Sequence, residues 1–235
     1  LGSNAVAVGS NTVAIGSTAR AGTGFTFNTP NSEVFAGSNA TAVGGRAEVN
    51  ALGGTAIGAN SEVSGDLGTA LGVSTQVTAT SAIAIGAGRQ ATANGAITIG
   101  SGTTEAAAAN AVAIGTDAVA SGGSAVAIGL GQTATGNGAV AIGDPNTAVG
   151  TGAVAIGADN TATGDGAVAV GNLTVANGNG AVAIGNGAQA NAAGAIALGD
   201  GAIANDPNTV SFGAPGTTRR LTNVTDGVAA NDAAT

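Results

Sequence analysis

Residues 143–157 read Gly-Asp-Pro-Asn-Thr-Ala-Val-Gly-Thr-Gly-Ala-Val-Ala-Ile-Gly. The last five of them, Ala153 to Gly157, alternate small and β-branched side chains, and this period of two predicts a short strand. Thr147 to Gly150 forms a second, shorter stretch, which also predicts a strand. The Gly, Asn, Asp and Pro residues between the two stretches are typical of tight turns. The segment therefore predicts one coil of a solenoid, with two short strands and two turns.

The pentad Ala-Val-Ala-Ile-Gly, or a close variant, recurs along the chain with a 14-residue period. Its closing glycines are Gly16, Gly44, Gly58, Gly72, Gly86, Gly100, Gly115, Gly129, Gly143, Gly157, Gly171, Gly185, Gly199 and Gly213. The first interval spans two periods because a pentad expected near residue 30 is missing, and the interval from Gly100 to Gly115 is one residue longer than the others. We place that extra residue around Glu105 to Asn110, as a bulge. A period kept this strictly predicts parallel coils stacked into an all-β solenoid.

The alternation within the pentad also predicts which side chains are buried. In the copy at 125–129, Val126 and Ile128 point to one side, and Ala125 and Ala127 point to the other. We expect the Val and Ile side chains to fill the inside of the coil, because burial of large apolar side chains stabilises a fold most. The opposite face then presents a long stripe of Ala to solvent. Since soluble monomers rarely expose such a stripe, the sequence predicts self-association.

Composition excludes most catalytic and metal-binding chemistry. The 235 residues include 43 Gly, 5 cations that are all Arg, and no His, Cys, Met, Trp or Tyr. Without His or Cys there is no ordinary zinc, haem or iron–sulfur site, no catalytic triad and no disulfide, so we predict no enzyme, no cofactor and no metal. A net charge of −8 without a basic stripe argues against nucleic acid or an anionic membrane as partner.

Two segments depart from the repeat. Residues 17–36 lack a pentad and contain Phe25, Phe27 and Phe35, which form either a recognition segment or an aromatic plug that repacks an irregular coil. From Ala214 onward the glycines thin out and the repeat stops. The first segment is thus a candidate binding element, and the second marks a change of structural element.

With the repeat and the tail established, the sequence resembles the YadA-like heads of trimeric autotransporter adhesins. The head repeat of that family, Asn-Ser-Val-Ala-Ile-Gly, is similar to residues 4–9, 11–16 and 110–115. The tail, with Asn208 to Gly213 followed by Arg220 to Val224, resembles the neck that joins such heads to a coiled-coil stalk. The resemblance divides the chain into a head at 1–213, irregular at 17–36, and a neck at 214–235.

The resemblance implies a left-handed parallel β-roll in a homotrimer, with the Ala-rich faces toward the trimer interior. It further implies a virulence-associated head on the outer membrane of a Gram-negative bacterium, which attaches to host extracellular matrix or cells or acts as a haemagglutinin. We expect the signal and the anchor to lie outside this chain. The implied adhesive motif residues are Asn4, Val6, Val8, Asn11, Val13, Ile15, Asn110, Val112 and Ile114. The implied neck residues are Arg219, Arg220, Asn223 and Asp226.

Three other interpretations of the repeat remain open. An ice-binding solenoid needs a regular Thr array, and Thr78-Ala79-Thr80, Thr133-Ala134-Thr135 and Thr161-Ala162-Thr163 have that local pattern. A calcium-loaded roll needs Asp at one recurring offset, which the scattered turn aspartates such as Asp144 and Asp200 do not show. The third alternative is a purely structural spacer with no ligand.

Overall fold

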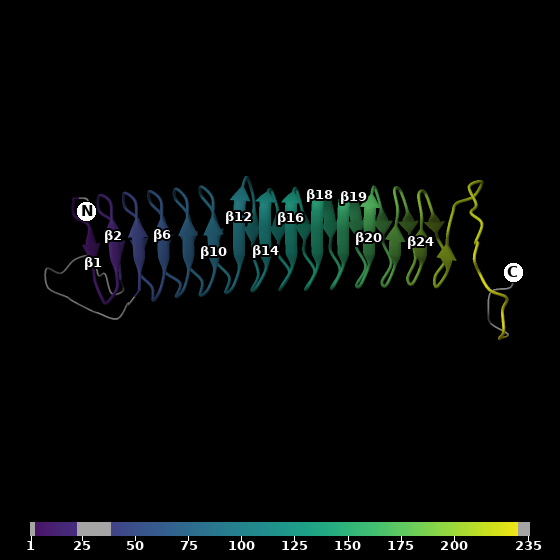
Figure 1. Cartoon of the computed structure of the whole chain (residues 1–235), viewed down its shortest axis with the longest axis horizontal. Helices are drawn as coiled ribbons and strands as arrows, with labels where there is room; N and C mark the ends of the chain where they lie inside the picture. The colour runs from purple at the N-terminus through teal and green to yellow at the C-terminus, as the bar shows by residue number, and fades with distance from the viewer. Residues whose placement is uncertain (1–2, 23–38, 230–235) are drawn as a thin grey trace.

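Each repeat folds as one coil that carries a strand of the pentad and a shorter strand. The computed structural model describes residues 3–22 and 39–229, in which the coils stack side by side into a straight rod (Figure 1). The two termini lie at opposite ends of the rod. No helix long and apolar enough to cross a membrane occurs in these two ranges. The missing pentad near residue 30 and the candidate segment with Phe25, Phe27 and Phe35 lie outside the described residues.

The strands form two parallel sheets that face each other. The long-strand sheet contains β2 (Val13–Ile15), β4 (Thr41–Val43), β6 (Thr55–Ile57), β8 (Thr69–Leu71), β10 (Ile83–Ile85), β12 (Ile97–Ser101), β14 (Val112–Thr116), β16 (Val126–Leu130), β18 (Val140–Ala148), β19 (Val154–Ala162), β20 (Val168–Asn172), β22 (Val182–Ile184), β24 (Ile196–Leu198) and β26 (Val210–Ser211). The short-strand sheet contains β1 (Val6–Ala7), β3 (Arg20–Ala21), β5 (Glu48–Val49), β7 (Glu62–Val63), β9 (Gln76–Val77), β11 (Gln90–Ala91), β13 (Glu105–Ala106), β15 (Val119–Ala120), β17 (Thr133–Ala134), β21 (Val175–Ala176), β23 (Gln189–Ala190) and β25 (Ile203–Ala204). The last residues of β18 and β19 continue into the short-strand sheet.

Register follows the repeat. Val126 pairs with Val140 and Ile128 with Ile142, so each residue of a strand lies beside its equivalent one period further along the chain. The same spacing relates Thr133 to Thr147 in the short-strand sheet. The predicted parallel β-solenoid with 14-residue coils and two short strands per coil is therefore confirmed.

The predicted orientation of the pentad is wrong. Ala125 and Ala127 are fully buried inside the coil, whereas Val126 and Ile128 point outward and stay partly exposed. The inside is nearly all Ala because the two sheets of so short a coil lie close together. The stripe that a single copy presents to solvent is thus made of Val and Ile, not of Ala.

Close packing in the first half of the rod shows how narrow the inside is. Val63 and Val77 point inward there, and Gly68, which directly precedes the facing strand β8, lies against both of them. A Cβ added to Gly68 would lie 2.9 Å from a methyl of Val63 and 2.8 Å from one of Val77. The space therefore admits an inward Val only opposite a Gly, since interiors are filled to crystal-like density.

Stacking also explains the glycine that closes each pentad. Gly129 has φ of +127°, and a Cβ built on it would lie only 2.0 Å from the carbonyl oxygen of Gly143 in the next coil. The same conflict with the next coil recurs at Gly115 and Gly143. A side chain at this position would force neighbouring coils apart, so the repeat requires Gly.

A column of buried polar side chains runs inside the second half of the rod. Asn146 donates from Nδ2 to Gln132 Oε1 at 3.1 Å, and Asn160 donates from Nδ2 to Asn146 Oδ1 at 2.8 Å. The Thr174 N–H then donates to Asn160 Oδ1 at 2.8 Å. All four side chains are at most 2% exposed. The column links four successive coils through hydrogen bonds that water does not reach.

The extra residue of the 15-residue repeat lies earlier than predicted. Ser101 pairs with Thr116, an offset of 15, but Glu105 already pairs with Val119, an offset of 14. The insertion therefore falls between Ser101 and Glu105 and not within Glu105 to Asn110. A regular turn, such as Gly185 to Ala188, has one residue fewer than the turn from Gly100 to Thr104. Gly187 and Gly102 both have a left-handed backbone, so they occupy the same place in the two turns. Thr103, which follows Gly102, is therefore the added residue.

Candidate binding surfaces

The outward side of the long-strand sheet forms an apolar face. Ile57, Ile156 and Ile184 on it are 40%, 38% and 42% exposed. Each strand contributes two outward residues, so the face consists of two parallel columns of side chains. In the first half of the rod one column carries Thr41, Thr55 and Thr69 in place of Val or Ile. The columns are aligned by the sheet register, so the exposed side chains form an unbroken stripe. The apolar face consists of Val13, Ile15, Thr41, Val43, Thr55, Ile57, Thr69, Leu71, Ile83, Ile85, Ile97, Ile99, Val112, Ile114, Val126, Ile128, Val140, Ile142, Val154, Ile156, Val168, Val170, Val182, Ile184, Ile196, Leu198 and Val210.

The outward side of the short-strand sheet forms a mostly polar face. Gln76 donates from Nε2 to Glu62 Oε2, and Gln90 donates from Nε2 to Gln76 Oε1, both at 3.2 Å. Thr133, Thr147 and Thr161 stand in register further along the same column. The outward column of the polar face is Arg20, Glu48, Glu62, Gln76, Gln90, Glu105, Val119, Thr133, Thr147, Thr161, Val175, Gln189 and Ile203. A ligand that touches this face meets a regular array of amides, carboxylates and hydroxyls.

The structure separates the predicted adhesive motifs. Asn4, Asn11 and Asn110 are exposed turn residues with φ of +57° to +58°. Val13, Ile15, Val112 and Ile114 lie on the apolar face. Val6 and Val8 belong to the first coil of the short-strand sheet, because β1 pairs with β3. The nine residues therefore do not form one site.

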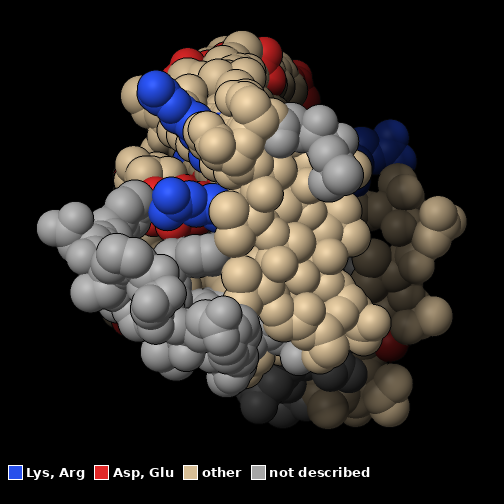
Figure 2. Space-filling model, turned by 90° about the vertical axis from the view of Figure 1, so that its left-hand side faces the viewer, with Lys and Arg blue, Asp and Glu red and all other residues tan. Residues whose placement is uncertain are grey.

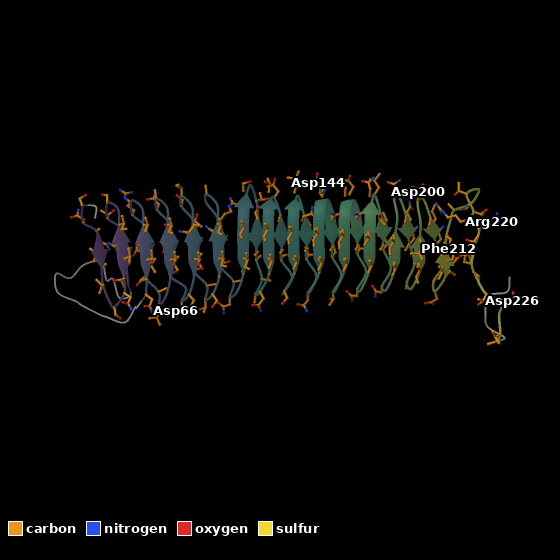
Figure 3. All side chains as sticks on the ribbon, viewed as in Figure 1. Asp66, Asp144, Asp200, Phe212, Arg220 and Asp226 are labelled. Carbon is orange, nitrogen blue, oxygen red and sulfur yellow. The ribbon has the colours of Figure 1, made fainter. Side chains whose placement is uncertain are left out.

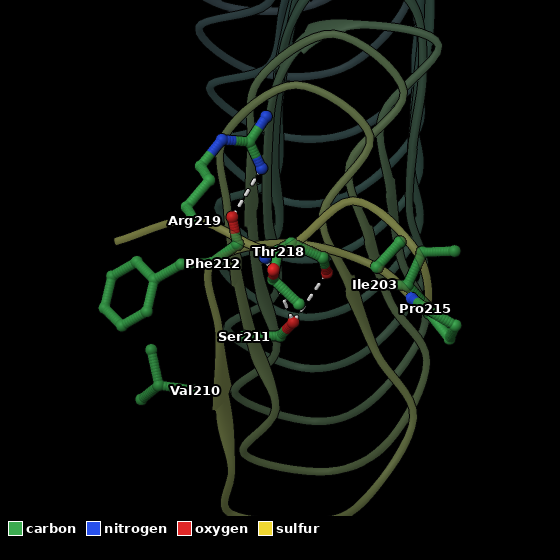
Figure 4. Close-up of a pocket in the computed structure, with 9 residues that line it drawn as sticks. Ile203, Val210, Ser211, Phe212, Pro215, Thr218 and Arg219 are labelled. Atoms are coloured by element: carbon green, nitrogen blue, oxygen red, sulfur yellow. Dashed lines mark hydrogen bonds between the residues drawn. The ribbon is translucent and has the colours of Figure 1, made fainter. Parts of the chain in front are cut away.

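The C-terminal end of the rod is closed by the Arg219 side chain. Its guanidinium donates from Nη1 to the Phe212 carbonyl oxygen and from Nη2 to the Asp200 carbonyl oxygen at 2.6 Å (Figure 4). A cavity of about 380 Å³ beside it is lined by Ile203, Val210, Phe212 and Pro215 among others. The remaining predicted neck residues, Arg220, Asn223 and Asp226, are exposed further along the tail.

Charges are sparse, and four of them, on Arg20, Glu48, Glu62 and Glu105, lie on the polar face. Figure 2, which views the N-terminal end, shows charged groups at the edges of a mostly uncharged end face. Asp66 lies at one edge of the roll, and Asp144 and Asp200 lie at the opposite edge (Figure 3). Within residues 3–22 and 39–229 no three acidic side chains gather as a metal site would require.

The Thr pattern of an ice-binding array is interrupted. Thr133 and Thr161 share a column with Thr147, but Val119 and Val175 flank them on either side. Thr78 stands two positions after Gln76, which occupies that column in its own coil. Among the described residues of the polar face this Thr ladder spans three coils, and it does not extend along the rod.

The short-strand sheet is interrupted once, between β11 and β13. In earlier coils Glu62 N–H donates to Thr75 O and Gln76 N–H donates to Arg89 O, each at 2.8 Å. In the part of the chain that the structure describes, no backbone hydrogen bond joins β11 to β13, although β10, β12 and β14 pair without a break. We call this interruption, lined by Gly88, Arg89, Gln90, Thr92, Thr103, Thr104 and Glu105, the open junction; it encloses a cavity of about 280 Å³.

Side chains at the open junction replace part of the lost pairing. Arg89 donates from Nη1 to Thr104 O at 3.2 Å, and Thr98 Oγ1 accepts the Ala106 N–H at 3.1 Å. Thr103 donates from its N–H and from its hydroxyl to Asp117 Oδ1, at 2.7 Å and 3.0 Å. These two bonds, together with the nearby Arg89 charge, hold the pKa of Asp117 below its ordinary value.

Comparison with protein families decides the assignment. A family model described as the YadA head domain repeat (2 copies) matches residues 1–19, 36–61, 64–88, 106–131, 134–160, 148–174, 162–188, 176–202 and 190–214. Together these ranges cover well over half of the chain. The chain belongs to the YadA head domain repeat family. Comparison with curated proteins gives no match.

Membership in the YadA head family has consequences for function. The family is one of structural adhesins on the bacterial cell surface and not of enzymes, in agreement with the expectation from composition. The family-model matches leave residues 89–105 uncovered, and these residues contain most of the open junction. The same uncovered range holds the added turn residue Thr103.

Sequence reasoning missed this site, although a signal was present. Arg89 stands in the inward column that holds Ser61, Thr75 and Ala118 in other coils, and a cation cannot be buried there without a partner. The 15-residue interval and an Arg at an inward position occur in adjacent coils. Together they indicate a local opening of the sheet.

Proposed function

We propose that the chain is the head of a homotrimeric surface adhesin, in which three copies pack through their apolar faces. The observation that supports this proposal is the unbroken stripe of partly exposed Val and Ile side chains on the long-strand sheet. Such a stripe exceeds what soluble monomers usually expose, and parallel strands that are apolar on both faces are normally covered on both faces. Two further copies supply that cover, and the polar faces then point outward to host surfaces.

The finer features of the proposal follow the family pattern. The roll is left-handed, the head comprises residues 1–213, and the neck at 214–235 leads toward a coiled-coil stalk. The clamp from Arg219 to the last coil supports a change of element at this point. The complete protein resides on the outer membrane of a Gram-negative bacterium, where it supports attachment to extracellular matrix or host cells, haemagglutination and virulence.

The assembly is tested by sedimentation equilibrium at several concentrations. We expect a species of three times 21.3 kDa for the wild-type chain and loss of that species in Ile128→Asp, which places a charge on the apolar face. Thr133→Asp, on the polar face of the neighbouring half-coil, is the matched control and stays trimeric. A folded wild-type monomer at all concentrations contradicts the proposal.

The adhesive role is tested separately with trimers of verified mass. We expect saturable binding to at least one immobilised extracellular-matrix protein or to host cells, strengthened by the three copies acting together. A trimer that binds none of these surfaces is a structural spacer. Absence of thermal hysteresis in the same sample excludes the ice-binding alternative.

A further inference from the structure

We propose that the open junction is a subsite for a neutral, hydroxyl-rich ligand of the size of one saccharide unit. It deepens the adhesive role proposed above and rests on it for its biological meaning. The cavity of about 280 Å³ lies just below the range of about 300–1,000 Å³ typical of drug-sized ligands, as suits a smaller ligand. It interrupts the polar face, so packing through the apolar face leaves it open.

The backbone presents hydrogen-bonding groups to this cavity. By the pattern of the preceding coils, the N–H groups of Gln90 and Thr92 would donate to Thr104 O and Ala106 O across the sheet. Among the described residues these two N–H groups have no such partner, because Arg89 takes Thr104 O instead. Both residues line the cavity. Backbone donors left open in this way favour a ligand that carries acceptors.

The side chains add acceptors and further donors. Glu105 is exposed on one side of the cavity, and Arg89, which uses Nε and Nη1 for Ala87 O and Thr104 O, lies on the other. The hydroxyl of Thr92 both donates and accepts. A sugar hydroxyl also donates and accepts, so it satisfies both kinds of group at once. With Asp117 close to Arg89, the local charge is not positive, which disfavours an anionic ligand.

Three departures from the regular coil coincide at the opening. Thr103 is the one added turn residue, Arg89 replaces a small inward residue, and Thr98 stands where neighbouring coils have Ala84 and Ala113. Thr98 is fully buried and holds the Ala106 N–H. All three lie where β11 and β13 do not pair, while the long-strand sheet continues beside them.

The test is an NMR titration of the isotopically labelled trimer with glucose, galactose, mannose and N-acetylglucosamine, and with the anionic N-acetylneuraminic acid. We expect saturable shifts of the Gln90 and Thr92 amides with at least one neutral sugar and a Kd on the order of 1 mM, typical of so small a ligand. No response to any neutral sugar at tens of millimolar overturns the proposal, as does a response to the anionic sugar alone.

Variants separate the site from the rest of the surface. Deletion of Thr103 restores a regular turn and is expected to abolish the shifts, and Glu105→Ala is expected to weaken binding about tenfold while it leaves the turn intact. Thr147→Val, on the regular part of the polar face, is the matched control and leaves binding unchanged. Equal binding by Glu105→Ala and the wild type refutes the site.

Adhesion assays on the same samples distinguish the two proposals. If the trimer binds a neutral sugar at the open junction but no host surface, the subsite is supported and the adhesive role is rejected. If the trimer attaches to host surfaces but shows no response to any sugar, the adhesive role is supported and the subsite is rejected.

Discussion

The two halves of the rod share the same 14-residue period but fill the inside of the coil with different residues. In the first half Val49, Val63 and Val77 point inward, and Gly54 and Gly68 stand opposite them. In the second half Ala occupies both sides, in the columns that include Ala125 and Ala134. A Val facing a Gly and an Ala facing an Ala fill a similar total volume, so the space between the two sheets stays the same while the individual residues change. The coil fixes the distance between the sheets, and the side chains adapt to it.

The inward polar column differs between the halves as well. Ser61 and Thr75 in the first half each make a hydrogen bond to a backbone carbonyl, at 2.8 Å and 2.6 Å. In the second half Asn146 and Asn160 bond to each other as well as to the backbone. Ser61 bonds within its own coil and Thr75 reaches one carbonyl of the next coil, whereas the amides bond side chain to side chain through successive coils. We therefore expect the second half to be the more cooperative.

The largest expected effect is that of Asn160→Ala. Ala fits this column, as Ala188 shows, but the change removes the partners of the Thr174 N–H and the Gly171 carbonyl. The hydrogen bonds of the buried Asn160 amide to Asn146, Ile156, Gly171 and Thr174 are lost together, so we expect the free energy of unfolding to fall by about 3 kcal/mol. Urea denaturation at fixed protein concentration measures it.

The matched control for Asn160→Ala lies in the first half of the rod. Thr75→Ala removes a single bond to Gly86 O and is expected to cost about 1 kcal/mol. Equal losses in the two variants contradict the difference drawn between the halves.

The second effect tests the packing of the first half. Gly68→Ala places a methyl group within 2.9 Å of Val63 and Val77, and we expect a loss of about 2 kcal/mol from overpacking. In the Val63→Ala, Val77→Ala background the same change is expected to be neutral or stabilising. Thermal denaturation of the wild type, Gly68→Ala, the double Val variant and the triple variant gives the coupling energy between Gly68 and the two Val residues. If Gly68→Ala costs as much in the double Val variant as in the wild type, the distance between the two sheets is not what limits the side chains.

Much of this fold is predictable from spacing alone. The positions of the closing glycines give the coil length, the parallel register and the two strands, because these depend only on the period. The orientation of Val126 and Ile128 was predicted wrongly because alternation identifies two faces without saying which is inside. Burial strength favours the larger residues, but the narrow coil holds mostly Ala at the inward positions of the pentad, with Thr98 as an exception.

The open junction shows a second limit of sequence reasoning. The extra residue is evident from the interval between Gly100 and Gly115, yet its place in the turn needs the register on both sides. The resulting split depends on hydrogen bonds from Arg89 and Thr98 to the backbone of other coils. Such contacts join residues that no local pattern relates.

Deletion of Thr103 tests whether the added residue separates the two parts of the short-strand sheet. The shortened turn matches Gly185 to Ala188, so β11 and β13 are expected to pair. Two to three restored backbone bonds raise the free energy of unfolding by about 1–2 kcal/mol. Hydrogen exchange checks this directly: the Gln90 and Thr92 amides exchange readily in the wild type and become protected in the variant. Unchanged exchange at both amides shows that Thr103 does not cause the opening.

The smallest effect expected is a pH dependence confined to the same junction. The two hydrogen bonds from Thr103 lower the pKa of Asp117 in the folded state. A lowered folded pKa contributes stability that is present above the ordinary carboxyl value of about 4 and is lost as the pH falls through the folded value. We therefore expect the Thr103 amide to be more protected in the wild type than in Asp117→Asn at pH 6, and the difference to shrink below about pH 4. Comparison at equal pH removes the intrinsic pH dependence of exchange. A difference that persists undiminished at low pH means that the amide of the variant, and not the charge of Asp117, determines how firmly the turn is held.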